Sequence, residues 1–196
     1  MRVSDLNWGR LTSWRTLLAS FWDVADYHPL LGEIGHVAIE YRPPNEAPDE
    51  IAPKALLLAG WLASRLGWEV SGKLNRDSEE VFECDLRAGD RALGLSFRQD
   101  KTAGRNDGLI SSVALAARNG EANFSVSRRT DGTKLQTEAQ IGTERKVGRV
   151  LAYETRSEAE QLGRELAFQS RDAIYEAAVA EAAQLVETIR NHKTTR

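Results

Sequence analysis

The residues best suited to bind a charged ligand lie in one loop, residues 98–108. This loop is the longest charged, glycine-containing link between the strands that the sequence predicts, and loops held on a rigid sheet often carry binding residues. Its three cations can donate charge-assisted hydrogen bonds to a phosphate group or to an acidic protein: Arg98, Lys101 and Arg105. The alternative is a solvated hairpin tip, in which neighbouring acids cancel the charge.

No sequence motif assigns a reaction to the chain. The glycine motifs of nucleotide-binding loops are absent, as are the nucleophile elbow of serine hydrolases and the two-histidine motif of metalloproteases. One cysteine and three scattered histidines exclude an internal disulfide and argue against a metal centre. Carboxylates are abundant, but no pair can be assigned to acid and base roles. We therefore expect no catalytic residue, no metal and no cofactor.

The single cysteine, Cys84, is expected to be buried. It lies between Phe82 and Leu86 at strand spacing, so the three side chains share one face. If that face is inward, Cys84 is a small buried hydrophobic residue whose thiol has a raised pKa. The alternative is a redox-responsive thiol, which alkylation of the native protein would reveal.

Length and charge restrict the class of protein further. A chain of 196 residues predicts one domain, residues 1–196, with a frayed tail at residues 192–196. The formal net charge of -3 gives no general attraction to nucleic acid or to anionic lipid. The longest uncharged apolar run has nine residues, 55–63, whereas a membrane span needs about 20. Because no secretory signal opens the sequence, the expected location is the cytoplasm.

Two helices are predicted in the first third of the chain. Apolar residues from Leu11 to Trp22 recur at helical spacing, with Thr12 or Ser13 as the N-cap. A second helix, residues 53–66, is apolar on most sides and ends before Gly67, so it should be the most buried helix of the fold.

Strands dominate the middle of the chain. Alternation predicts a short strand at residues 37–41, and further strands at residues 68–74, 81–87, 92–98, 109–117, 122–128 and 134–141. The short links, Asn119-Gly120 and Asp131-Gly132 in particular, are typical of hairpins. Two more helices follow, one opening on a capping box at Ser157 and one beginning past Ser170. The expected fold is α+β: an antiparallel meander of about six strands, with helices from both chain ends on one face.

Two tryptophans near the start of the chain have different expected roles. Trp14 lies on the apolar stripe of the first helix and should be in the core. Trp8 precedes that stripe, so it either packs the helix entry onto the core or is available to a partner protein. Full burial of Trp8 in the isolated chain would argue against this stretch as a contact surface.

Two blocks of sequence resemble one known family. Residues 5–15, DLNWGRLTSWR, followed by Leu17-Leu18-Ala19 and Phe21-Trp22-Asp23, resemble the opening of the C-terminal region of the OpcA family, glucose-6-phosphate dehydrogenase assembly proteins. Residues 57–68, LLAGWLASRLGW, resemble a second signature of that family. A weaker match is Gly163-Arg164-Glu165-Leu166, with Arg171-Asp172 and Tyr175-Glu176.

The resemblance implies a non-catalytic cytoplasmic protein. It would bind glucose-6-phosphate dehydrogenase, promote the active oligomer of that enzyme and raise its activity in the oxidative pentose phosphate pathway. Family members are about twice as long, so a separate N-terminal domain is a further expected partner. The expected contact residues are Asp5, Asn7, Trp8 and Arg10, since Trp and Arg are common interface anchors, with Arg98, Lys101 and Arg105 as second choice.

Two alternatives stay open. One is a sugar-phosphate-binding or enzymatic domain, which the basic loop and the pathway suggest. The other is a structural module that only docks a missing N-terminal half. Ligand stabilisation without any dehydrogenase would favour the first, and association with an added N-terminal half would favour the second.

Overall fold

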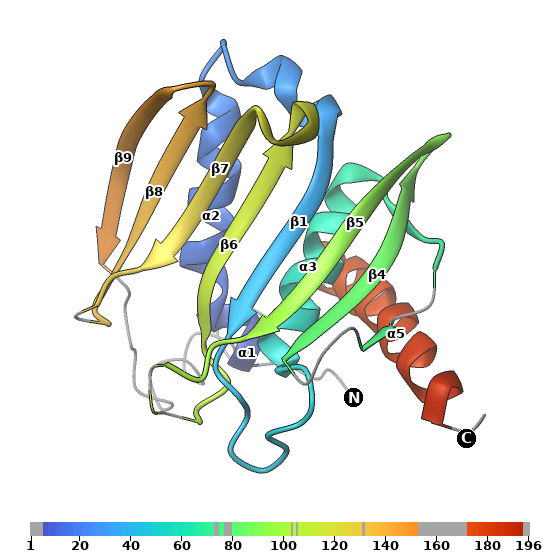
Figure 1. Cartoon of the computed structure of the whole chain (residues 1–196). Coiled ribbons are helices and arrows are strands. Elements are labelled where there is room, and N and C mark those ends of the chain that lie inside the picture. The colour runs from blue at the N-terminus through green and yellow to red at the C-terminus, as the bar shows by residue number, and fades with distance from the viewer. Residues whose placement is uncertain are drawn as a thin grey trace.

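The fold is an α+β arrangement of one large sheet and a few helices (Figure 1). The structure, a computed structural model, describes residues 6–72, 75–76, 80–102, 104, 106–130, 132–152 and 172–193. The helices are α1 Leu6–Arg10, α2 Thr12–Ser20, α3 Pro53–Leu66 and α5 Ala173–Lys193, with 3₁₀ turns at Phe21–Asp23, His28–Glu33 and Arg118–Gly120. The strands are β1 Ile34–Tyr41, β2 Glu69–Val70, β3 Asn75–Arg76, β4 Val81–Ala88, β5 Arg91–Gln99, β6 Ile110–Ala117, β7 Ala122–Arg128, β8 Lys134–Ile141 and β9 Glu144–Ala152.

The strands from β4 to β8 begin and end close to where the alternation of the sequence places them. In β5 the alternate residues Leu93, Leu95 and Phe97 are buried, as a sheet with one covered face requires. The Asn119-Gly120 link joins β6 to β7, and both residues have positive φ angles, 55° and 95°. This hairpin is therefore confirmed, and its turn needs residues that tolerate the left-handed region.

The predicted six-stranded antiparallel meander is wrong in size and in topology. In the described part of the chain, the sheet has nine strands in the order β2-β4-β5-β1-β6-β7-β8-β9, with β3 also paired to β4. Strand β1 lies between β5 and β6, parallel to the first and antiparallel to the second. Turn residues predict pairing only between strands that are neighbours in sequence. Strand β1 is separated from both of its partners by α3 and by β2 to β4. The sheet is therefore mixed.

This topology explains the long loop at residues 98–108. Because β1 separates β5 from β6, the loop is not a hairpin tip but a connection that passes the end of β1. The amide of Asp100 donates to the carbonyl of Tyr41 at 2.7 Å. The amide of Gly108 donates to the carbonyl of Pro43 at 3.2 Å. The length of the loop thus has a topological cause.

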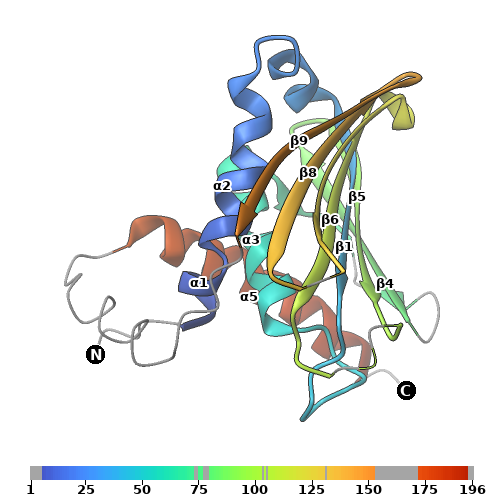
Figure 2. The same ribbon diagram turned by 90° about the vertical axis from the view of Figure 1, so that its left-hand side faces the viewer.

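The described helices cover a single face of the sheet, as predicted (Figure 2). The core lies between the two layers, and its largest fully buried side chains include Trp14, Tyr41, Phe97 and Phe124. Burial raises the pKa of Tyr41 to about 12. The hydroxyl of Tyr41 donates to the carbonyl of Glu50 at 3.4 Å, so its polar end has a partner.

Helix α3 matches its prediction. Pro53 occupies the first turn, and Gly67 caps the C-terminus with a left-handed φ of 64°. Seven of its residues are buried: Ala55, Leu57, Leu58, Ala59, Gly60, Leu62 and Ala63. Gly60 faces α5, where an added Cβ would stand 2.8 Å from the amide nitrogen of Ala182. The two helices therefore approach closely at a residue without a side chain.

The first predicted helix corresponds to α2 and the 3₁₀ turn after it, whereas the short helix α1 that precedes α2 was not predicted. Helices α1 and α2 meet at Leu11, which occupies the N-cap position of α2 with helical backbone angles. The expected capping by Thr12 or Ser13 is wrong, because no side chain caps α2 and the Thr12 hydroxyl instead donates to the carbonyl of Gly9 at 2.9 Å. The apolar stripe is confirmed, since Trp14 and Leu17 are buried.

Two strands at the ends of the sheet depart from the predictions. In place of a strand at residues 68–74, β2 comprises only Glu69–Val70, and Trp68 is buried directly after α3. Strand β9 was not predicted, because all nine of its residues are exposed and it lacks an alternating apolar face. A strand that buries no side chain leaves little signal in its sequence.

The last helix, α5, begins close to its expected start. Ala178 and Leu185 are buried as predicted, but Ile174, placed on the same apolar stripe, is 44% exposed. The helix expected at the Ser157 capping box lies outside the described residues, as do residues 194–196 of the expected frayed tail. Among the described residues, no helix is long and apolar enough to cross a membrane.

Candidate functional site

The opening block of the chain is held by the last helix. Trp8, in α1, donates from its indole nitrogen to a carboxylate oxygen of Asp172 at 2.8 Å. The guanidinium of Arg15 lies 3.4 Å from the centre of the Trp8 ring, a cation–π distance, and the ring of Tyr175 lies 5.5 Å away. These contacts leave Trp8 only 6% exposed.

Trp8 is thus a packing residue in the isolated chain. The expectation that its side chain is exposed for a partner is wrong, because the indole is covered by groups from α2 and α5. Asn7 and Arg10, beside it on α1, keep part of their surface exposed. Asp5 lies outside the described residues. Contact through Asn7 and Arg10 stays a prediction.

Asp172 joins the two ends of the chain through one carboxylate. One of its oxygens accepts the Trp8 indole hydrogen, and the other accepts from the amides of Ile174 and Tyr175 at 3.1 and 3.0 Å. It therefore caps α5 in the ordinary way of an Asp at a helix start. Sequence reasoning missed this residue, although an Asp before a helical pattern signals an N-cap.

The side chain of Arg15 completes this junction. Its Nη2 group donates to the carbonyl of Trp8 at 3.4 Å and to the hydroxyl of Thr12 at 3.2 Å. Burial lowers the pKa of Arg15, while the charge of Asp172 acts in the opposite direction. An arginine remains charged in this setting, so the junction combines a cation, an aromatic ring and a carboxylate.

The cations of the 98–108 loop have different surroundings. Arg98 lies near the end of β5 as an exposed residue, beside Glu40 in the register of β1. Lys101 pairs with Glu80 at 3.2 Å, and both side chains are about half exposed. Arg105 lies outside the described residues. Arg98 and Lys101 therefore face different acids, and their contact with a partner stays a prediction.

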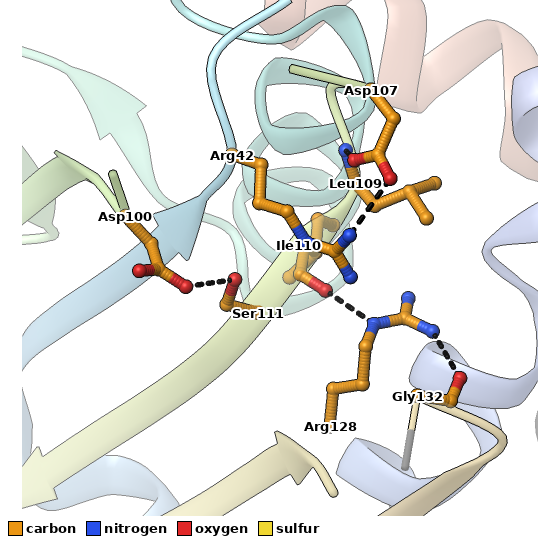
Figure 3. Close-up of polar contacts among 8 residues, drawn as sticks. All are labelled: Arg42, Asp100, Asp107, Leu109, Ile110, Ser111, Arg128 and Gly132. Atoms are coloured by element: carbon orange, nitrogen blue, oxygen red, sulfur yellow. Dashed lines mark hydrogen bonds and ion pairs between the residues drawn. The ribbon is translucent and has the colours of Figure 1, made fainter. Parts of the chain in front are cut away.

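A partly buried set of polar contacts fixes the base of this loop (Figure 3). Arg42, at the end of β1, donates to Asp107 at 2.8 Å, and the other oxygen of Asp107 accepts the amide of Leu109 at 3.1 Å. Arg128 in β7 donates to the carbonyls of Ile110 and Gly132, each at 3.2 Å. These arginines bind groups of the chain itself, which identifies them as structural.

Asp100 anchors the other end of the loop (Figure 3). Its carboxylate accepts from the hydroxyls of Ser111 and Thr102 at 2.7 and 2.5 Å. Partial burial acts to raise the pKa of Asp100, but these hydrogen bonds outweigh it and hold the pKa below its ordinary value. The loop is consequently secured at both ends by carboxylates, Asp100 and Asp107.

Cys84 is buried, as predicted, with 3% of its surface exposed. Burial, with a smaller contribution from Asp85, raises the pKa of the thiol to about 11. We predict that iodoacetamide at pH 8 labels the native chain at least ~100-fold more slowly than the urea-unfolded chain, because so little thiolate forms. Mass spectrometry over time measures this ratio, and comparable rates in the two states would contradict the burial.

The fold and site together define the class of the molecule. Its described residues form an α+β fold with one mixed sheet, helices on a single face of that sheet and charged surface loops. In the part of the chain that the structure describes, no group of three His, Cys, Asp or Glu side chains could hold a metal ion.

The chain belongs to the family of OpcA C-terminal domains. The model of this family, described as the C-terminal domain of a glucose-6-phosphate dehydrogenase subunit, matches residues 1–179. The match confirms the resemblance that residues 5–15 and 57–68 carry.

Curated relatives carry the same family name. The "Putative OxPP cycle protein OpcA" of Synechocystis sp. is 29% identical over 188 residues, which cover 91% of this chain and 38% of that protein. The protein of the same name from Nostoc punctiforme is 45% identical over 67 residues, covering 34% of this chain and 13% of the relative. The chain thus spans well under half the length of these relatives.

A solved structure shares the fold. It is a variant of KijD10, a 3-ketoreductase from Actinomadura kijaniata, with a TM-score of 0.57 and 12% sequence identity. The similarity covers 93% of this chain and 58% of that one. At this identity the similarity concerns the fold alone.

Proposed function

We propose that this chain is a non-catalytic subunit that binds glucose-6-phosphate dehydrogenase, promotes the active oligomer of the enzyme and raises its activity. The observation that carries the proposal is the family match over residues 1–179, whose description names a subunit of this dehydrogenase. The relatives named as OxPP cycle proteins support a role in the same pathway.

The proposed mechanism is a shift in an equilibrium of the enzyme. A protein that binds one oligomeric state more tightly than another favours the first state only by its difference in affinity. A tenfold shift needs about 1.4 kcal/mol of such difference, which a few interface residues can supply. The reacting groups all belong to the enzyme in this scheme.

The proposed contact surface is the exposed part of the opening block, centred on Asn7 and Arg10. The junction of Trp8 with Asp172 holds α1 in place, so these neighbours are presented without a large cost of ordering on binding. Arg98 and Lys101 form the second proposed surface, since both are accessible to an acidic partner.

A titration with the cognate dehydrogenase tests the proposal. We expect association at micromolar concentration, together with a rise in activity and in the fraction of active oligomer. Arg10→Glu should weaken the association by about tenfold or more, because it reverses a charge within the proposed interface. Arg65→Glu, at an exposed arginine in the last turn of α3, is the matched control and should bind like the parent chain.

The possible results separate the proposal from its alternatives. Absence of both association and activation would overturn the proposal for this chain. Thermal stabilisation by glucose 6-phosphate or NADP without any dehydrogenase would instead favour a ligand-binding or enzymatic domain. Association only with an added N-terminal half would favour a structural module.

A further inference from the structure

The sheet has a second face, which lies opposite the described helices (Figure 2). None of the described helices covers it. The pairing register places the outward residues of this face in three rows. Each row crosses seven strands, in the order β4-β5-β1-β6-β7-β8-β9. One row begins at Asp85 on β4 and ends at Arg145 on β9, and passes through Gly94, His36, Ala116, Asn123 and Gln140.

The centre of this face is made of small side chains. Ala38, Ala114 and Ala116 occupy it on β1 and β6, with Gly94 and Ser96 beside them on β5. Such residues let a second sheet approach closely, since little protrudes between the two layers.

His36 is the one bulky side chain at this centre, and its ring lies over Gly94. Its Cδ2 atom is 2.7 Å from the position that a Cβ on Gly94 would take. The missing side chain at Gly94 is thus what allows the imidazole to lie across β5. A larger residue at Gly94 would force the ring away from the sheet.

The two ends of the face differ in charge. Glu83 and Asp85 stand at the β4 end, and Arg145 stands at the β9 end, where it pairs with Glu138 at 2.6 Å and remains 67% exposed. Val147 and Val150 of β9 are 59% and 47% exposed, and the register places both on this face. An acidic end and an apolar end with an exposed, ion-paired arginine therefore flank a small-residue centre.

We propose that this face, which we call the open face, packs against the open face of a second copy of the chain. The copies are related by a two-fold axis that lies between the two faces, over β6, and runs nearly parallel to the strands. The axis places Ala116 opposite its own copy, Asp85 opposite Arg145, and Val81 opposite Val150. Such an interface is self-complementary, because each unlike pair occurs twice. The chain matches itself in charge at Asp85 and Arg145 and in apolar surface at Val81 and Val150, while Glu83 lies opposite Val147. The two matched pairs are why a second copy is the occupant.

The size of the face suits a stable dimer. Seven strands about 4.8 Å apart, with three rows about 6.8 Å apart, give roughly 700 Å² per copy. Standard protein interfaces bury about 800 Å² per partner. Aligned packing of two twisted sheets at about 30° preserves most of this contact.

Sedimentation equilibrium of this chain alone, without dehydrogenase, tests the dimer. We expect a dimer at micromolar concentration that Ala116→Glu weakens by at least ~100-fold, since it places two like charges opposite each other at the axis. Ala177→Glu, an equivalent change at an exposed site on α5, is the control and should leave the dimer intact. A monomer at ~100 μM, or a dimer that tolerates Ala116→Glu, would overturn the proposal.

An exchange of charges tests the geometry without touching the centre. Asp85→Arg and Arg145→Asp should each weaken the dimer, and the double variant should recover at least ~10-fold of the loss, because the two positions face each other across the axis. Equal loss in the double variant would contradict the two-fold arrangement. This measurement decides the matter if Ala116→Glu does not fold. Since no dehydrogenase is present, its result is independent of the proposed function.

Discussion

Gly60→Ala should destabilise the chain by about 2 kcal/mol or more, although alanine is the better helix former. An added Cβ would clash with the backbone carbonyl of Ala178 and stand 2.8 Å from the amide nitrogen of Ala182. Overpacking against backbone costs about 1–3 kcal/mol in a well-packed core and more where nothing can move, whereas the helix propensity returns at most ~1 kcal/mol. Urea unfolding, followed by circular dichroism, measures the difference.

Gly32→Ala is the matched control for this change. Gly32 lies in the 3₁₀ turn His28–Glu33, and nothing lies within 4 Å of the Cβ it would gain. We expect its free energy of unfolding to change by less than ~0.5 kcal/mol. A net stabilisation in Gly60→Ala would mean that α3 and α5 do not pack at this position.

How much of the sheet could be predicted depended on whether pairing was local. The hairpins β4–β5, β6–β7 and β7–β8 were found because short turns such as Asn119-Gly120 connect strands with one buried face. The place of β1 was not found, because its alternation predicts a strand but says nothing about its partners. A parallel neighbour needs a crossover, and the sequence does not state where the chain returns.

In the candidate site, too, local features could be predicted from the sequence and long-range contacts could not. The accessibility of Arg98 and Lys101 could be predicted because charged side chains are rarely buried. The buried position of Cys84 could be predicted from its strand spacing with Phe82 and Leu86. The pairs Arg42–Asp107 and Trp8–Asp172 could not be predicted, because they join residues 65 and 164 positions apart. The sequence supplies a donor and an acceptor, but only the fold brings them within hydrogen-bond distance.

The length of the 98–108 loop illustrates how a single misplaced strand changes a functional interpretation. If the loop were a hairpin tip, its unusual length would indicate a binding role. As a connection past β1, it needs that length to join β5 to β6, and Asp100 and Asp107 secure it to neighbouring segments. Its cations therefore require separate evidence of binding, which the titration with dehydrogenase provides.

Trp8→Ala should cost about 3–5 kcal/mol of stability, the usual loss for a large aromatic residue in a core. The indole is 6% exposed and contacts Arg15, Tyr175 and Asp172, so its removal leaves a cavity and removes the hydrogen bond to Asp172. Trp8→Phe keeps most of the packing and removes only the donor, so its cost should be about 1 kcal/mol. Urea unfolding of the two variants measures both losses.

A double-mutant cycle isolates the contact between α1 and α5. Trp8→Phe and Asp172→Ala should be non-additive by at least ~0.5 kcal/mol, because both changes remove the same hydrogen bond. Additive losses would show that this bond contributes nothing to stability.

The same variants distinguish a packing role of Trp8 from a role in recognition of the dehydrogenase. If Trp8 acts only by holding α1, Trp8→Phe should bind the dehydrogenase with nearly the affinity of the parent chain. A loss of affinity beyond its loss of stability would instead place the indole at the interface, and α1 would then have to separate from α5 on binding.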